Sequence, residues 1–246
     1  MSVPLARRLA AEAAGTGLLV TVVAGSGIAA QRLSPNDAGA QLMENSTATV
    51  FGLAVLILIF GPVSGAHFNP AVSLVDWLAG RRTGTGLTGG EAAAYSAAQT
   101  GGAVLGAILA NIMFDTAAGQ ISTHHRITGG HLVGEIVATA GLIALILTLA
   151  RTGRATLAPV AVAAWIGAAY WFTSSTSFAN PAVTIGRIFT DSFAGIAPAS
   201  APGFIAAQLL GGLLGLGAVA YFHPARPMAA HAVISHTVDS KGARPQ

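Results

Sequence analysis

The sequence contains no cysteine and very little charge. Without cysteine, disulfide bonds, thiolate nucleophiles and cysteine-based metal sites are excluded. Only 9% of the 246 residues are charged, whereas soluble domains carry about 25% charged residues. Charged side chains are therefore too few to cover a surface in contact with water, and the composition predicts an integral membrane protein.

Lysine is nearly absent as well, because Lys241 is the only one and arginine supplies the rest of the positive charge. The arginines stand singly or in pairs between apolar runs. Surfaces that bind nucleic acid need such residues in clusters. We therefore expect no nucleic-acid partner.

Long apolar runs are what the sequence has in abundance. Six of them have about the length that crosses a bilayer as a helix, at residues 9–30, 47–63, 91–113, 131–150, 156–172 and 202–222. The first follows Arg7 and Arg8, as in a signal peptide, but Glu12 lies inside it and the rest of the chain is equally apolar. We expect a retained first span in an all-α membrane protein with six transmembrane helices.

Two further apolar runs, 69–79 and 180–189, are too short to cross a membrane, and both begin with Asn-Pro. Asparagine favours the position before a helix, and proline favours its first turn. Half-length helices at membrane depth are tolerated only where they are buried in protein or line a watery cavity. The sequence therefore predicts two re-entrant half-helices, which begin with the motifs Asn69-Pro70-Ala71 and Asn180-Pro181-Ala182.

The two motifs belong to an internal repeat. Glu12 in the first span matches Glu135 in the fourth, and Gln99 matches Gln208. Each copy holds three full spans and one half-helix, so the second copy enters the membrane from the opposite side. We expect an inverted repeat whose half-helices meet at the midplane.

The expected channel domain covers residues 1–222, with repeat one at about 5–115 and repeat two at about 128–222. Residues 223–246 contain Pro224, Pro227, several histidines and a polar end, and are expected to form a disordered cytoplasmic tail. With the N-terminus in the cytoplasm, nine Arg and Lys residues lie inside and three outside, which favours this orientation in the inner membrane. The three outside are Arg32, Arg126 and Arg187.

Two helix starts that face each other would bring two positive dipole ends to one point. The side-chain amides of Asn69 and Asn180 would also donate hydrogen bonds to a passing oxygen. A neutral solute gains from this arrangement, whereas a cation or a hopping proton meets an electrostatic barrier.

On these motifs the chain resembles the aquaporin and aquaglyceroporin (major intrinsic protein) family over roughly residues 5–222. The resemblance implies six tilted spans, a homotetramer with one pore in each subunit, no cofactor and no enzymatic activity. It further implies that Glu12 and Glu135 support the pore loops. His67, Phe68 and Phe178 are expected to line the pore or its mouth.

The sequence departs from the family at the selectivity filter, where most members have an arginine directly after the second Asn-Pro-Ala. That position holds Val183. Thr49 stands where a bulky aromatic residue is usual, and Ser177 occupies a third filter position. Counting back from the second motif places Ala168 at the fifth-span filter position, whereas aligning the span places Tyr170 there, which we favour.

A filter with valine in place of arginine is expected to be wider and less polar on one wall. We therefore expect passage of water and of larger neutral solutes: glycerol, urea, or metalloid hydroxides such as arsenous acid, the neutral form of arsenite. The pattern is similar to bacterial family members associated with arsenic resistance. The alternative is that Arg187, one helical turn further out, reaches into the pore mouth and restores a filter.

Other functions are less well supported by the residues. A secondary transporter shares inverted repeats but needs an ionisable group in the substrate path, and only Glu12 and Glu135 lie well inside full spans. A non-conducting structural member of the same fold is a further alternative. His124, His125 and Arg126 form a polar group in an outside loop without a third metal ligand, so a solvated loop is favoured over a metal site.

Overall fold

The computed structural model describes residues 3–81 and 84–223, and within these residues its only regular secondary structure is helical. Six helices are long and apolar enough to cross a membrane, which confirms the expected all-α membrane fold. They contain α1 (Leu5–Leu33), α2 (Ala38–Ser64), α4 (Gly89–Met113), α5 (Gly129–Arg151), α6 (Ala158–Phe172) and α8 (Ala201–Phe222), and the spans of α6 and α8 begin at Ala155 and Pro198. Short 3-10 turns precede α6 (Ala155–Leu157) and α8 (Pro198–Ser200). Nearly all of the predicted tail, 224–246, lies outside the described residues.

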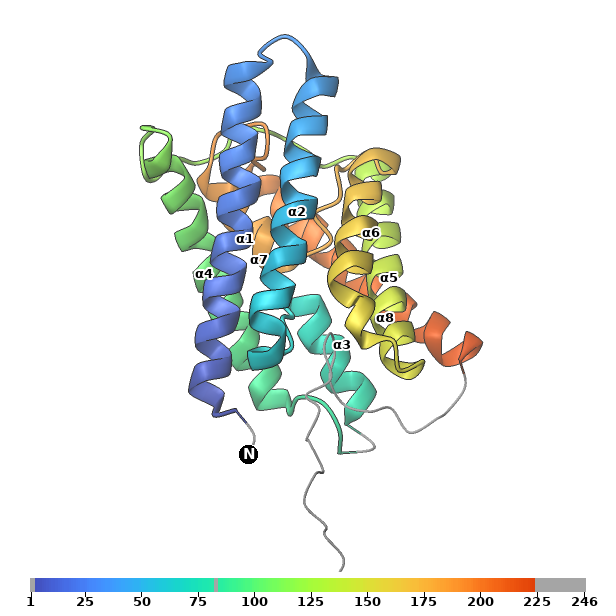
Figure 1. Cartoon of the computed structure of the whole chain (residues 1–246). Helices are drawn as coiled ribbons and strands as arrows, with labels where there is room; N and C mark the ends of the chain where they lie inside the picture. Colours follow the sequence, from blue (N-terminus) through green and yellow to red (C-terminus); the bar gives the residue numbers. More distant parts are fainter. Residues whose placement is uncertain (1–2, 82–83, 224–246) are drawn as a thin grey trace, which may run out of the picture.

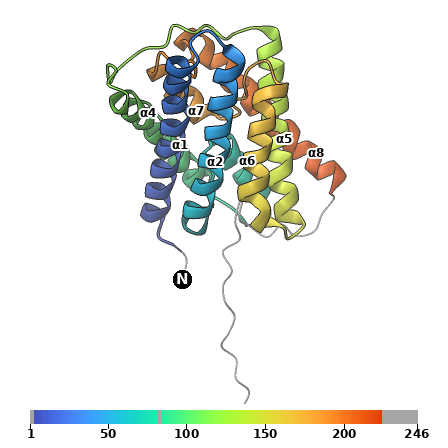
Figure 2. The same ribbon diagram turned by 45° about the horizontal axis from the view of Figure 1, so that its top comes forward.

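Two short helices lie between the spans, as predicted. Helix α3 (Pro70–Gly80) lies in the lower half of the molecule in Figure 1, and α7 (Pro181–Gly186) lies above it near the centre. Helix α7 is shorter than the expected 180–189, because its last turn, Arg187–Phe189, tightens into a 3-10 helix. The turned view in Figure 2 places α4 at one edge and α8 at the other, with the remaining spans between them.

Helix α2 begins well before its expected start at residue 47. Asp37 caps the helix by accepting a hydrogen bond from the Ala40 amide at 2.9 Å. The residues that follow include several polar ones, so an apolar run does not mark this first part of the helix. One of them, Asn45, is buried and donates to the Val23 carbonyl of α1 at 2.9 Å. The helices α1 and α2 therefore form the long hairpin at the top of Figure 1.

Glycines allow the spans to cross at backbone contact. A Cβ atom added at Gly102 of α4 would lie 2.1 Å from the Ala13 carbonyl oxygen of α1. In the second repeat, a Cβ atom at Gly211 of α8 would lie 2.5 Å from the Ile136 carbonyl oxygen of α5. Small residues at such crossings let membrane helices pack through van der Waals contact. Each repeat is thus built around one close pair of spans, α1 with α4 and α5 with α8.

This packing predicts a difference between two neighbouring glycines of α4. Gly102→Ala forces α1 and α4 apart, and such overpacking costs about 1–3 kcal/mol. The midpoint of thermal unfolding in detergent should fall by roughly 5 °C. Gly101→Ala is the matched control, because a Cβ atom there meets nothing within 4 Å. Equal midpoints for the two variants would contradict the crossing geometry.

Candidate functional site

The two Asn-Pro-Ala motifs begin the two half-helices. Asn69 caps α3 by accepting a hydrogen bond from the Ala71 amide at 2.9 Å. Asn180 caps α7 by accepting from the amides of Ala182 at 3.0 Å and Val183 at 3.2 Å. Both asparagines have extended backbone angles, and proline follows each in the first helical turn. Local sequence preferences alone therefore explain where each half-helix starts.

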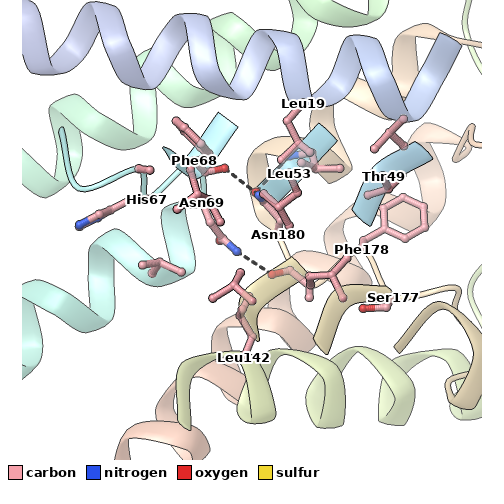
Figure 3. Close-up of a pocket in the computed structure, with 18 of the residues that line it drawn as sticks. Leu19, Thr49, Leu53, His67, Phe68, Asn69, Leu142, Ser177, Phe178 and Asn180 are labelled. Carbon is pink, nitrogen blue, oxygen red and sulfur yellow. Dashed lines mark hydrogen bonds between the residues drawn. The ribbon is translucent and has the colours of Figure 1, made fainter. Parts of the chain in front are cut away.

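The same asparagines link the two halves of the chain. Nδ2 of Asn69 donates to the Ala179 carbonyl at 2.7 Å, and Nδ2 of Asn180 donates to the Phe68 carbonyl at 2.7 Å (Figure 3). Each amide nitrogen carries two hydrogens, so one remains for a further acceptor. The carbonyls of Phe68 and Ala179 are consequently bonded within the protein.

The loop in front of each motif adopts an unusual backbone. Ala66 and Phe68 both have φ of 49°, and Ser177 and Ala179 have φ of 45° and 48°. Left-handed angles at residues other than glycine cost about 1–2 kcal/mol each. Such strain persists only where the surroundings hold it in place.

Glu12 holds the first loop. Its Oε1 accepts from the Ser64 hydroxyl at 2.6 Å and the His67 amide at 3.0 Å. Its Oε2 accepts from the Phe68 amide at 2.7 Å and from Nε2 of Gln99 at 2.7 Å. A fully buried carboxylate with four donors satisfies its own charge and fixes the loop at the same time.

Glu135 holds the second loop in the same way. It accepts from the amides of Phe178 at 2.9 Å and Ala179 at 2.8 Å, and from Nε2 of Gln208 at 2.6 Å. Gln208 also donates to the Thr184 hydroxyl at 2.9 Å. In the first repeat, Gln99 makes the equivalent bond to the Ser73 hydroxyl at 3.0 Å.

The hydroxyl residues Ser73 and Thr184 were missing from the predicted site. Each lies four residues after the asparagine of its motif, and this shared spacing was the signal that could have identified them. They join each half-helix to the glutamine that supports its loop.

One cavity passes the meeting point of the half-helices. In Figure 3, His67 lies at one end of the labelled residues, Thr49, Ser177 and Phe178 lie toward the other, and the two asparagines lie between. Aliphatic side chains form much of the remaining wall. The lining residues are Leu19, Val23, Thr49, Leu53, Ile57, Ala66, His67, Phe68, Asn69, Val72, Leu142, Ile146, Val162, Ile166, Tyr170, Ser177, Phe178, Ala179, Asn180, Val183 and Arg187.

All four residues proposed for the filter line this cavity, and two of them are in contact. The hydroxyl groups of Thr49 and Tyr170 lie 3.2 Å apart. Ser177 and Val183 also line the cavity. Of the two alternatives in the fifth span, Tyr170 lines the cavity, whereas Ala168 is exposed on the outer surface of the helix bundle.

Arg187 is buried in the cavity wall, with 1% of its surface exposed. Its Nε donates to the Ala194 carbonyl, and its guanidinium carbon lies 3.4 Å from the centre of the Phe178 ring. Arg126, expected in a solvated loop, is only partly exposed there and donates to the carbonyls of Gly195 at 2.7 Å and Phe193 at 2.6 Å.

Burial lowers the pKa of the Arg126 guanidinium from its ordinary value. Its guanidinium carbon also lies 5.5 Å from the Phe178 ring centre. Sequence reasoning could not place this residue, because its partners follow α7, far along the chain. His124 and His125 beside it are exposed, as expected for a loop.

Comparison with known proteins places this geometry in context. The sequence matches the family model described as Major intrinsic protein over residues 1–177. It is 49% identical over 225 residues to aquaglyceroporin AqpS of Rhizobium meliloti (strain 1021), covering 91% of this chain and 94% of that relative. It is 34% identical over 196 residues to aquaporin NIP1-1 of Zea mays, covering 76% and 65% of the two chains. The fold is similar to the X-ray structure of the aquaglyceroporin from Plasmodium falciparum, with a TM-score of 0.61, 20% identity and coverage of 88% and 96%.

Proposed function

Because the chain belongs to the major intrinsic protein family, whose members are membrane channels and not enzymes, we propose that it passes small uncharged solutes down their gradients, water and glycerol among them. The observation that carries this proposal is the cavity that runs past Asn69 and Asn180, where the two half-helices meet. The similarity to a bacterial aquaglyceroporin over nearly the whole chain favours glycerol as one solute.

The outer part of the cavity favours solutes larger than water. Thr49, Ser177 and Val183 are small for positions that narrow a pore, and all three line the cavity. Hydroxyl groups on Thr49, Tyr170 and Ser177 supply hydrogen-bond donors and acceptors to a solute that has left its hydration shell. We therefore include urea and neutral metalloid hydroxides such as arsenous acid among the proposed solutes.

Exclusion of ions is proposed to begin at the asparagines. The amide hydrogens left after the cross-links and the N-terminal ends of the half-helices present partial positive charge to the path. A cation or a proton that moves along a file of water is repelled there, whereas a neutral oxygen accepts a hydrogen bond.

A transporter driven by protons is disfavoured by the positions of the two glutamates. Both oxygens of Glu12 and of Glu135 accept hydrogen bonds from the protein. Neither residue is among those that line the cavity within the described part of the chain. Their structural role is to hold the strained loops, and solute flux is proposed to need no coupling ion.

The excess of Arg and Lys in the segments assigned to the inside favours an inner-membrane protein with both termini in the cytoplasm. A homotetramer is proposed from the family, since exposed apolar side chains on α2, α4 and α8 suit either lipid or neighbouring subunits. These side chains include Phe51, Leu105 and Leu213.

The test is an uptake panel with the purified chain in liposomes. We expect water, glycerol, urea and arsenite, supplied at a pH where arsenous acid is neutral, to enter faster than into protein-free vesicles. Flux should rise linearly with the gradient and be insensitive to a proton ionophore. Water entry alone would exclude the wide-pore proposal, and no flux of any solute would favour the non-conducting alternative.

A further inference from the structure

Arg187 is the one strongly basic side chain among the described residues that line the cavity. Its placement follows from a change in backbone. Helix α7 ends at Gly186, where a Cβ atom would lie 2.7 Å from the Ala103 carbonyl oxygen of α4. The 3-10 turn that follows begins with Arg187, whose side chain lies in the cavity wall.

The guanidinium of Arg187 is fixed by one hydrogen bond and one aromatic ring, but not all of its N–H groups have an acceptor among the described residues. Nε donates to the Ala194 carbonyl, and the Phe178 ring covers one face of the guanidinium plane. Nη2 is buried and has no hydrogen-bond partner in the part of the chain that the structure describes. A buried charged donor without a partner is costly unless something else accepts its hydrogen bond. An oxygen atom that passes through the cavity is such an acceptor.

Among the described residues, no acidic side chain forms an ion pair with Arg187. The two ion pairs formed by described residues are Arg8 with Glu91 and His124 with Asp191, and neither includes Arg187. A second cation, Arg126, shares the Phe178 ring and binds the carbonyls on either side of Ala194. Two guanidinium groups therefore lie against Phe178, which is a residue of the cavity wall.

Two residues of the cavity wall have buried polar atoms without a hydrogen-bond partner among the described residues. The Ser177 hydroxyl is buried and, like Nη2 of Arg187, lacks a partner among the described residues. The apolar faces of Phe178 and Val183 complete this section. A solute with oxygen atoms on one edge and hydrocarbon on the other matches both walls.

We infer that Arg187 is the specificity-determining cation of the outer cavity, although it stands four residues after Val183 rather than beside the second Asn-Pro-Ala. Its free N–H groups bind the oxygen atoms of passing neutral solutes, and its fixed charge repels cations and protons. This inference rests on the proposed channel function. Arg187, one turn further along the chain, thus supplies the positive charge that most family members carry at the position of Val183.

The positive charge of Arg187 also adds to the electrostatic barrier from the second half-helix, which is short. Helix α7 has six residues in α conformation, whereas α3 has eleven, so fewer aligned peptide groups contribute to its positive end. A fixed side-chain charge supplements the weaker dipole on that side of the asparagines.

The test is Arg187→Gln in liposomes, with proton entry followed by an internal pH dye under a potassium gradient and valinomycin. Glutamine removes the charge but keeps an N–H donor for the Ala194 carbonyl. We expect proton entry to rise at least about fivefold over wild type, and Arg187→Lys to return it toward the wild-type rate. Arg32→Gln is the matched control, because Arg32 also binds a carbonyl and lies 5.3 Å from a ring, that of Phe114, but does not line the cavity.

Water and glycerol entry are measured on the same vesicles and show whether each variant is folded and open. Wild-type proton entry in an Arg187→Gln channel that still passes water would overturn the inference while leaving the channel function intact. An equal leak in Arg32→Gln would also overturn it, because the effect would then not depend on the cavity. Absence of all solute flux in the wild-type protein would instead overturn the proposed function.

Discussion

Replacing Glu12 by leucine is expected to abolish solute flux and to leave little folded protein. The carboxylate accepts hydrogen bonds from four donors, and two of them are the backbone amides of His67 and Phe68. Hydrogen bonds to charged groups contribute about 1.5–3 kcal/mol each, so their joint loss costs on the order of 5 kcal/mol or more. That is a large part of the stability of an ordinary domain, which is about 5–15 kcal/mol.

The amount of monodisperse protein in detergent and the rate of glycerol entry into liposomes measure this effect. Glu12→Gln keeps an acceptor oxygen for part of the network and should retain more folded protein than Glu12→Leu. Glu44→Leu is the control at a carboxylate that is only partly buried and accepts from the Ser34 hydroxyl at 2.7 Å. Normal yield and flux in Glu12→Leu would show that the loop does not depend on the carboxylate.

Val183→Arg is expected to lower glycerol entry by at least about tenfold, which corresponds to about 1.4 kcal/mol in the barrier to permeation. Val183 lines the cavity and is 5% exposed. An arginine there adds bulk and charge to a wall that already contains Arg187 and Tyr170. Water is smaller and accepts a hydrogen bond from the new side chain, so its entry should fall less.

Stopped-flow measurement of water and glycerol entry on the same vesicles gives this selectivity directly. Val183→Leu adds volume without charge and separates the two causes, and it should reduce glycerol entry by a smaller factor. Unchanged glycerol entry in a Val183→Arg channel that still passes water would remove Val183 from the proposed path.

The fold was predictable because its signals are local. A bilayer span needs an uninterrupted apolar run, and a half-helix that begins with Asn-Pro needs only its own first turn. The start of α2 was missed because Nδ2 of the buried Asn45 donates to α1, so a polar residue belongs to the span. The end of α7 was missed because the contact between Gly186 and Ala103 joins distant parts of the chain.

The site residues also fall into those that a local or repeated pattern predicts and those that depend on contacts between distant residues. The repeat paired Glu12 with Glu135 before any geometry was known, and the structure places both against the backbone of the loops. The positions of Arg126 and Arg187 could not be deduced in this way. They depend on three successive carbonyls, at residues 193–195, whose directions are set by a loop without a repeating pattern. Side-chain direction in such a loop is a tertiary property.

The crossed hydrogen bonds of the two asparagines also set an order in time for a chain that is threaded into a membrane as it is made. Phe68 and Asn180 are 112 positions apart, a stretch that takes roughly 6–22 s to synthesise at about 5–20 residues per second. During that interval the Phe68 carbonyl and the Asn69 amide exist without their final partners. The two crossed bonds, and with them the meeting of the half-helices, can therefore form only after the second half of the chain has been made.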